Sequence, residues 1–206
     1  MTSERGVLLV LSGPSGVGKD TLLDAWIASN PRVRRVITYT TRPPRPNEEN
    51  GVDYHFVTEE RFHQLADAGH FFEHKSVHGN WYASPKTDAL EFVAQGYIAV
   101  LKIDVQGALD VAQDFPEAVL VFILPPSGEE LERRIRNRGV GDEDEVLRRL
   151  ANAHGEISKA DRYHFRIVND EIDRAVSELE SAVASVAQLP RDARGRWAGR
   201  PDSDPG

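Results

Sequence analysis

The 206-residue sequence contains no cysteine. Disulfide bonds and thiolate metal sites are therefore excluded, and a reducing intracellular compartment is the expected location. A long apolar run is also missing, because the stretch "VLLVLSG" near the start breaks into glycines after a few residues. Such a run is too short to cross a membrane. We therefore expect a soluble, cytoplasmic protein with no membrane partner.

Basic residues are in the minority. The chain has 25 lysines and arginines against 33 aspartates and glutamates, a net charge of -8. This balance argues against a nucleic-acid partner, because such affinity comes from cations that neutralise phosphates. Any phosphate that the protein binds must meet a local basic cluster. The length and the 40% hydrophobic content suit one compact unit with mobile lobes; the oligomeric state stays open.

The apolar pattern alternates between strands and helices. Unbroken apolar runs rich in valine, isoleucine and leucine predict strands that helices cover on both faces; they lie at residues 7–11, 98–103, 118–124 and in "FRIV" ending at Val168. Helical spacing follows or separates these runs at residues 18–29, 85–95, 107–114, 128–137, 145–159 and 172–189. The alternation predicts an α/β fold with a parallel sheet flanked by helices.

Two segments interrupt this alternation, and a third follows it. Residues 34–84 are rich in proline, aromatic residues and histidine and predict a small inserted lobe, which leaves residues 1–33 and 85–189 as the core. Residues 134–149 place arginines on both sides of a bend rich in glycine and acids, which predicts an exposed lid. The polar stretch 190–206 predicts a disordered tail.

A phosphate-binding loop is the strongest motif. In "LSGPSGVGKDTLL", the pattern G-x-x-x-x-G-K-[ST] runs from Gly13 to Lys19 and then meets Asp20 where a hydroxyl residue is due. The glycines let backbone N–H groups surround a phosphate, and the following helix and Lys19 add positive charge. We expect a nucleoside triphosphate at Gly13, Pro14, Ser15, Gly16, Val17, Gly18, Lys19, Asp20 and Thr21. A glycine-rich turn without a ligand is the weaker alternative.

The inserted segment carries candidate ligands for a second phosphate. Arg42 and Arg45 stand three apart in a proline-stiffened loop, where two guanidinium groups can converge on one anion, and Tyr54 and Tyr82 can add hydroxyl donors. Glu73 lies in apolar company and needs a donor if it is ionised. Guanine offers the paired donors N1–H and N2–H, which adenine lacks. Solvated surface arginines, and a Glu73 paired with a nearby lysine, remain open alternatives.

The chain resembles the guanylate kinase family from about Val7 to about Leu189. The resemblance is carried by motifs that agree in order and spacing: "GPSGVGK", "TTRPPRPNEENGVDYHFV", "FFEHKSVHGNWYASP", "IDVQG", "FILPPS", "RIRNRG" and "IVND". It implies a P-loop NTPase-type core with a GMP-binding lobe and a small lid. It also implies Mg²⁺-dependent transfer of the terminal phosphoryl group of ATP to GMP, and leaves open whether dGMP also serves.

The resemblance further implies roles for individual residues. Arg42, Arg45, Tyr54 and Tyr82 would hold the GMP phosphate, and Thr38, Glu73 and Ser84 would read guanine, while Glu48 and Asp104 would complete the acceptor side. Arg134, Arg138 and Arg149 would gather around the transferring phosphoryl group, and Asn169 would contact adenine. Lys19, Arg42, Arg138 and Arg149 are the residues expected to be catalytic.

Two positions depart from the family pattern. Asp20 replaces the hydroxyl residue expected to ligate magnesium, and Lys102 in "VLKIDVQG" stands where the family usually has an acid. The usual hydroxyl and acid sum to -1, whereas Asp20 and Lys102 sum to zero and still supply one carboxylate. We hypothesise that the carboxylate has moved to the loop, where Asp20 meets the metal directly or through water, while Lys102 pairs with Asp20 or with a phosphate.

Two other functions remain open from the sequence. Ribose 1,5-bisphosphate phosphokinase, a small kinase of similar fold, can carry G-K-D in this loop, but its family lacks the acceptor set between Arg42 and Ser84. A binding module resembling the guanylate-kinase-like domains of scaffold proteins would keep the lobe without catalysis. Lys19 and the lid arginines speak against such a module, and Asp20 and Lys102 favour it.

Overall fold

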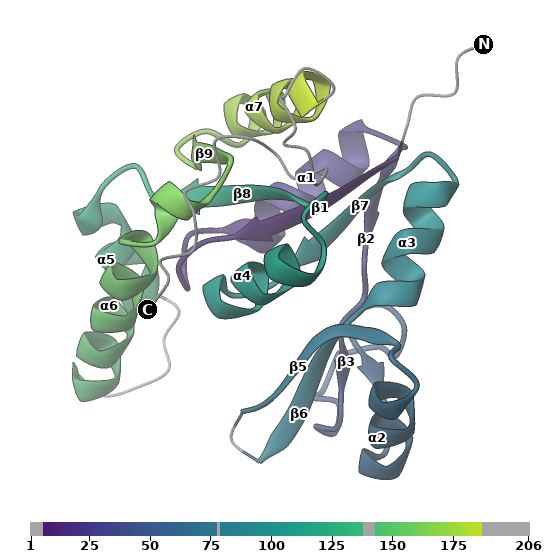
Figure 1. Cartoon of the computed structure of the whole chain (residues 1–206). Coiled ribbons are helices and arrows are strands. Elements are labelled where there is room, and N and C mark those ends of the chain that lie inside the picture. Colours follow the sequence, from purple (N-terminus) through teal and green to yellow (C-terminus); the bar gives the residue numbers. More distant parts are fainter. Residues whose placement is uncertain (1–5, 78, 138–142, 187–206) are drawn as a thin grey trace.

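Five parallel strands form the main sheet of the computed structural model, which describes residues 6–77, 79–137 and 143–186. Their order across the sheet is β2-β7-β1-β8-β9, so β1 is central (Figure 1). All four pairings are parallel. The strands span Val7–Ser12 (β1), Val33–Arg35 (β2), Ile98–Lys102 (β7), Val119–Leu124 (β8) and Phe165–Val168 (β9).

Helices cover both faces of this sheet, which is why its strands are apolar on both sides. Leu9 and Leu11 of β1 belong to the core cluster that α1 and α7 close, whereas Leu8 and Val10 belong to the cluster closed by α3 and α4. Successive strand residues point to opposite faces, so one unbroken apolar run fills two cores. The four helices span Lys19–Ser29 (α1), Lys86–Ala94 (α3), Val105–Asp114 (α4) and Ile172–Ser185 (α7).

A second sheet lies apart from the first in Figure 1, with the order β4-β3-β6-β5. The antiparallel hairpin of β5 and β6 is its largest part, and α2 packs on it through the buried ring of Phe62, which lies 5.1 Å from the Phe71 ring and 5.9 Å from the Trp81 ring. The elements span Tyr39–Thr40 (β3), His55–Phe56 (β4), Glu59–Asp67 (α2), Phe71–Val77 (β5) and Asn80–Pro85 (β6).

Helices α5 (Gly128–Asn137) and α6 (Glu143–Ile157) pair beside the main sheet and share a small core of Leu131, Ile135 and Ala153. A 3-10 turn, η1 (Ala160–Arg162), leads from α6 towards β9. The bend predicted between the two helices, including Arg138, lies outside the described residues, and so does the predicted tail at 190–206.

The predicted fold class is confirmed: a parallel sheet is flanked by helices, and each apolar run predicted to be a strand forms one. The helix expected from residue 107 begins earlier, at Val105, because the Asp104 side chain accepts a hydrogen bond from the Gly107 N–H and caps it. Among the described residues, no helix is long and apolar enough to cross a membrane.

The packing of β8 generates a stability prediction. Phe122 is fully buried and its ring meets that of Tyr163 at 4.9 Å. Phe122→Ala should lower the free energy of unfolding by about 3–5 kcal/mol, because it removes apolar contacts and leaves a cavity. Urea unfolding measures the change. Val52→Ala, at a 54% exposed position, is the control and should shift stability by less than about 0.5 kcal/mol; equal effects of the two would contradict the described core.

Candidate active site

The loop between β1 and α1 needs glycine for its shape. Gly18 precedes α1 in the left-handed region at φ 95°, and a Cβ atom there would lie 2.7 Å from the Asn169 Nδ2 atom. Gly13 has φ 143°, and a Cβ atom there would lie 2.4 Å from the Ile123 carbonyl oxygen. The loop is therefore pressed against the ends of β8 and β9, where a side chain would not fit.

The loop encloses a cavity of about 290 Å³, called here the loop cavity. Lys19 stands at its wall, and its ammonium donates to the carbonyl oxygens of Gly13 at 2.5 Å and Pro14 at 3.0 Å. A cation and the N-terminus of α1 thus face the same space, which suits an anion. The lining residues are Gly13, Ser15, Gly16, Gly18, Lys19, Asp20, Lys102, Ile103, Asp104 and Glu156.

Asp20 meets two cations at the first turn of α1. Its Oδ1 atom accepts a hydrogen bond from the Lys102 ammonium at the end of β7, and lies 3.7 Å from the Arg35 guanidinium, which also pairs with Asp24 at 2.6 Å. Partial burial alone would raise the pKa of Asp20, but the hydrogen bond and charge of Lys102, with Arg35 and Lys19, hold it below its ordinary value. The carboxylate is therefore ionised at neutral pH.

A second cavity, the lobe cavity, has a volume of about 260 Å³ and lies between the small sheet and the end of β7. Its lining residues are Arg35, Val36, Thr38, Asp53, Tyr54, Glu73, Lys75, Val77, Tyr82, Ser84, Lys102, Ile103 and Asp104. The last three also line the loop cavity. The two cavities therefore meet at residues 102–104.

Glu73 is the buried acid of the lobe cavity. Burial raises its pKa above the ordinary range, and a hydrogen bond from the Ser84 hydroxyl at 2.6 Å acts in the opposite direction. Ser84 itself is fully buried. The carboxylate thus has one fixed donor and faces an open space that can admit more, which suits a ligand with paired N–H groups.

Arg42 is held by an acid rather than left to solvent. Its guanidinium forms two hydrogen bonds with Glu48, at 2.9 and 3.0 Å, and the same carboxylate accepts from the Arg45 N–H at 2.7 Å. The hydrogen bond from Arg42 and then that from Arg45 lower the pKa of Glu48. Arg42 also lies over the Tyr54 ring, 5.5 Å from its centre. Glu48 therefore positions Arg42 beside the lobe cavity.

Lys75 is a site residue that the sequence reasoning missed. Its ammonium forms an ion pair with the Oδ2 atom of Asp104, whose Oδ1 atom caps α4. Lys75 stands two residues after Glu73 on β5, and both side chains line the lobe cavity. Period-two alternation from Glu73 was the signal that would have found it. Arg35, which lines the cavity from β2, carried no such signal.

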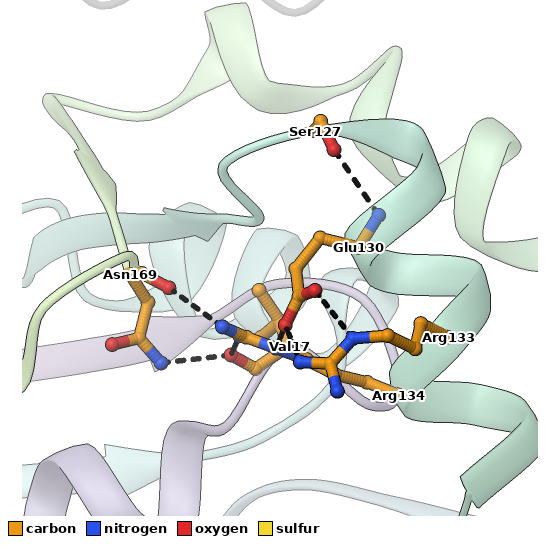
Figure 2. Close-up of polar contacts among 6 residues, drawn as sticks. All are labelled: Val17, Ser127, Glu130, Arg133, Arg134 and Asn169. Atoms are coloured by element: carbon orange, nitrogen blue, oxygen red, sulfur yellow. Dashed lines mark hydrogen bonds and ion pairs between the residues drawn. The ribbon is translucent and has the colours of Figure 1, made fainter.

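Arg134 of α5 contacts the phosphate loop at Val17 (Figure 2). Its guanidinium donates to the Val17 carbonyl oxygen at 3.1 Å and to the Asn169 carbonyl oxygen at 3.3 Å, while Glu130 accepts from its Nε atom at 2.7 Å. The Asn169 amide also donates to Val17 at 2.8 Å. Among the described residues, the buried Oδ1 atom of Asn169 finds no hydrogen-bond donor.

The described structure brings most of the expected residues together, but not all of them. Six loop residues line the loop cavity, namely Gly13, Ser15, Gly16, Gly18, Lys19 and Asp20, and the lobe cavity is lined by Thr38, Tyr54, Glu73, Tyr82 and Ser84, with Asp104 shared by both. Eight other expected residues line neither of the two cavities: Pro14, Val17, Thr21, Arg42, Arg45, Glu48, Arg134 and Asn169. Arg149 instead pairs with Glu145 on its own helix at 2.9 Å and lines neither cavity. Arg138, expected beside it, lies outside the described residues.

Comparison with known proteins decides the family. The family model described as guanylate kinase matches residues 5–186. The chain belongs to the guanylate kinase family. It is 43% identical over 186 residues to a guanylate kinase of Thermosynechococcus vestitus, covering 90% of this chain and 97% of that protein. It is 46% identical over 183 residues to the one of Nitratidesulfovibrio vulgaris, covering 88% of each.

Solved structures agree with this family. The crystal structure of guanylate kinase from Anaplasma phagocytophilum is 32% identical and has a TM-score of 0.68, with 96% of this chain and 90% of that chain covered. The match to a crystal structure of shikimate kinase from Bacteroides thetaiotaomicron, at 18% identity and a TM-score of 0.50, covers 86% of this chain and 98% of that chain. That second likeness shows the fold alone.

The two residues that depart from the family pattern, Asp20 and Lys102, contact each other in the structure. Asp20 and Lys102 are 82 positions apart in the chain and form one ion pair between the loop and the end of β7. The pairing of Lys102 with Asp20 is one of the two partners hypothesised from the charge sum. The exchanged residues therefore compensate each other electrostatically within the described structure.

The hydrogen bond between Ser84 and Glu73 generates a titration prediction. Ser84→Ala removes the donor that favours the ionised carboxylate, while burial persists, so the pKa of Glu73 should rise further. Carbon-13 NMR of the glutamate carboxyl group measures the shift. Ser158→Ala, at a serine that donates to Gly155 in an exposed turn, is the control and should leave Glu73 unchanged; an unaltered pKa in Ser84→Ala would contradict the described contact.

Proposed function

We propose that this chain is an ATP:GMP phosphotransferase that converts GMP and ATP to GDP and ADP. Family membership and the named relatives support the activity. The observation that carries the residue assignments is the joining of the two cavities at residues 102–104, because phosphoryl transfer requires donor and acceptor in line. One cavity is built around a phosphate loop, and the other around a buried carboxylate.

The loop cavity takes the ATP phosphates in this proposal. Backbone N–H groups of the glycine-rich loop, the N-terminus of α1 and the Lys19 ammonium bind them. Lys19 leaves the carbonyl oxygens of Gly13 and Pro14 to do so. The adenine 6-amino group would supply a donor to the Asn169 Oδ1 atom, which lacks one among the described residues. Arg134 keeps that region in place through Val17.

The residues at the loop also fit a magnesium ion. Asp20 offers a half-exposed carboxylate in the loop cavity, and magnesium in such sites usually takes one or two carboxylates together with phosphates and water. No cluster of three or more possible metal ligands forms among the described residues. When bound, the ion would neutralise phosphate charge.

The lobe cavity takes GMP. Glu73 accepts from the guanine N1–H and N2–H groups, Ser84 and Thr38 complete the base contacts, and Asp104 lies near the ribose or the base. Arg42 and Arg45, with the hydroxyl groups of Tyr54 and Tyr82, bind the GMP phosphate, and Glu48 orients Arg42.

Transfer then requires positioning and positive charge rather than a general base, because the attacking atom is an oxygen of the GMP phosphate. Closure of the lobe and the lid excludes water and brings Arg138 and Arg149 to the transferring group. In the described structure Arg149 is held by Glu145, so this role needs it to change partner.

The alternatives weighed from the sequence are not favoured. A family match over residues 5–186 includes the whole acceptor lobe, which the ribose 1,5-bisphosphate phosphokinase family lacks. The binding-module alternative drew on Asp20 and Lys102 as damaging changes. Their ion pair keeps the loop charge-balanced and leaves Lys19 at the loop cavity, which removes that argument.

Acceptor choice tests the function directly. In a coupled assay of ADP release, GMP should exceed AMP by at least about 1,000-fold in kcat/KM, because adenine leaves the buried Glu73 without its donors. Glu73→Gln should lower kcat/KM for GMP by roughly 10- to 100-fold. Glu178→Gln, at a partly exposed glutamate of α7, is the matched control and should leave kcat/KM unchanged. Turnover equal to that without acceptor would refute the proposal.

The exchanged pair gives a double-mutant test. Lys102→Asp should lower kcat/KM for Mg-ATP most, because two carboxylates then face each other beside the triphosphate, and Asp20→Ser should lower it less. The double variant restores the family pattern and should recover activity, with a coupling energy of roughly 1–3 kcal/mol. Strictly additive effects of the two substitutions would show that Asp20 and Lys102 act independently.

A further inference from the structure

Lys102 occupies a place that no other cation in the described structure shares. Arg35, Lys75 and Lys102 are the described cationic residues that line the lobe cavity, and only Lys102 also lines the loop cavity. Lys102 is the last residue of β7, and its backbone is fixed by pairing with Leu11 of β1. Its stem is therefore anchored at the junction of the two cavities, and its ammonium can serve either one.

Its present partner is an acid on the loop side. The ammonium pairs with Asp20, whose carboxylate also has Arg35 at 3.7 Å, so Asp20 does not lose all positive neighbours if Lys102 leaves. On the lobe side, Lys75 is already paired with Asp104, and Arg35 is shared with Asp24. The other two cations of the lobe cavity are thus also paired with acids, Lys75 with Asp104, and Arg35 with Asp24 at 2.6 Å and more distantly with Asp20.

The Lys102–Asp20 pair is placed so that it can be exchanged. The two side chains are 29% and 52% exposed, and ion pairs this exposed contribute little net free energy. A phosphate dianion forms stronger charge-assisted hydrogen bonds with an ammonium group. When the Asp20 carboxylate also contacts the metal ion of a bound nucleotide, it attracts the Lys102 ammonium less strongly.

We propose that Lys102 is a shared phosphate ligand that couples the two cavities. It is bound to Asp20 while the loop cavity is empty, and it is released to the acceptor phosphate when a metal–nucleotide complex engages Asp20. Occupation of the loop cavity therefore raises the affinity of the lobe cavity for a nucleoside monophosphate. The identity of the two ligands rests on the proposed function, whereas the exchange rests on the position of Lys102.

Calorimetry with a pair of ligands that cannot react tests the exchange. GMP is titrated into the protein alone and into the protein saturated with Mg-ADP. The wild type should bind GMP roughly tenfold more tightly with Mg-ADP present. Lys102→Met should lose most of that gain, so that the ratio of the two GMP dissociation constants, without and with Mg-ADP, approaches one. Asp20→Asn should do the reverse: it frees Lys102, so GMP binds more tightly before any donor is added.

Lys75→Met is the matched control. It removes a lysine that also pairs with an aspartate and lines the lobe cavity, but not the loop cavity. It should change GMP affinity by the same factor with and without Mg-ADP. Thermal melting checks that each variant is folded, and Lys102→Gln serves if Lys102→Met is not.

Two results would overturn the exchange: a Lys102 variant that keeps the wild-type ratio within twofold, or an Asp20→Asn variant with unchanged donor-free affinity. Either result leaves the proposed function standing as long as the wild type forms GDP. If the wild type bound GMP neither alone nor with Mg-ADP, the proposed function itself would be refuted.

Discussion

The parallel register between β1 and β7 is the constraint on which both cavities depend. Leu11 pairs with Lys102 at the last step of this ladder, and the Ile103 N–H donates to the Leu11 carbonyl oxygen at 3.3 Å. The phosphate loop begins directly after β1, and residues 102–104 follow or end β7. Because parallel strands end at the same edge of a sheet, residues far apart in the chain meet there. A slip of this register would separate the loop from Asp104.

Acids hold several of the cations of this site, and this arrangement explains much of its geometry. Glu48 fixes Arg42, Asp104 fixes Lys75, and Asp20 with Asp24 fixes Arg35. A long cationic side chain loses rotamer freedom when it binds a phosphate, and one that is already oriented loses less. Glu73 differs from these acids because it pairs with no cation in the described part of the chain: its donor is the neutral hydroxyl of Ser84, and burial disfavours its charged form. Its environment favours a ligand that brings donors, which is why it is suited to select a base.

The predictability of the fold followed the length of each apolar run. Strands β1, β7 and β8 are long, apolar and buried on both faces, so their sequences alone predicted them. Strand β2 has three residues, two of them arginines, and pairing with β7 creates it. Strands β3 and β4 have two residues each, too few for any period. Of the site, the loop and Glu73 carry local signals, whereas the contact of Lys102 with Asp20 depends on long-range register, and the sequence offered only the charge sum.

The Asp20–Lys102 pair also constrains the route by which such a site can arise. Two exchanges separate it from the family pattern of a hydroxyl and an acid, and the two orders differ. Aspartate first would set two carboxylates against each other beside a triphosphate, so repulsion would act in the protein and against its ligand. Lysine first leaves a hydroxyl and an ammonium, a combination that a polyanion tolerates. If the two substitutions arose one at a time, activity would therefore fall less when the acid at position 102 became lysine before the hydroxyl residue at position 20 became aspartate.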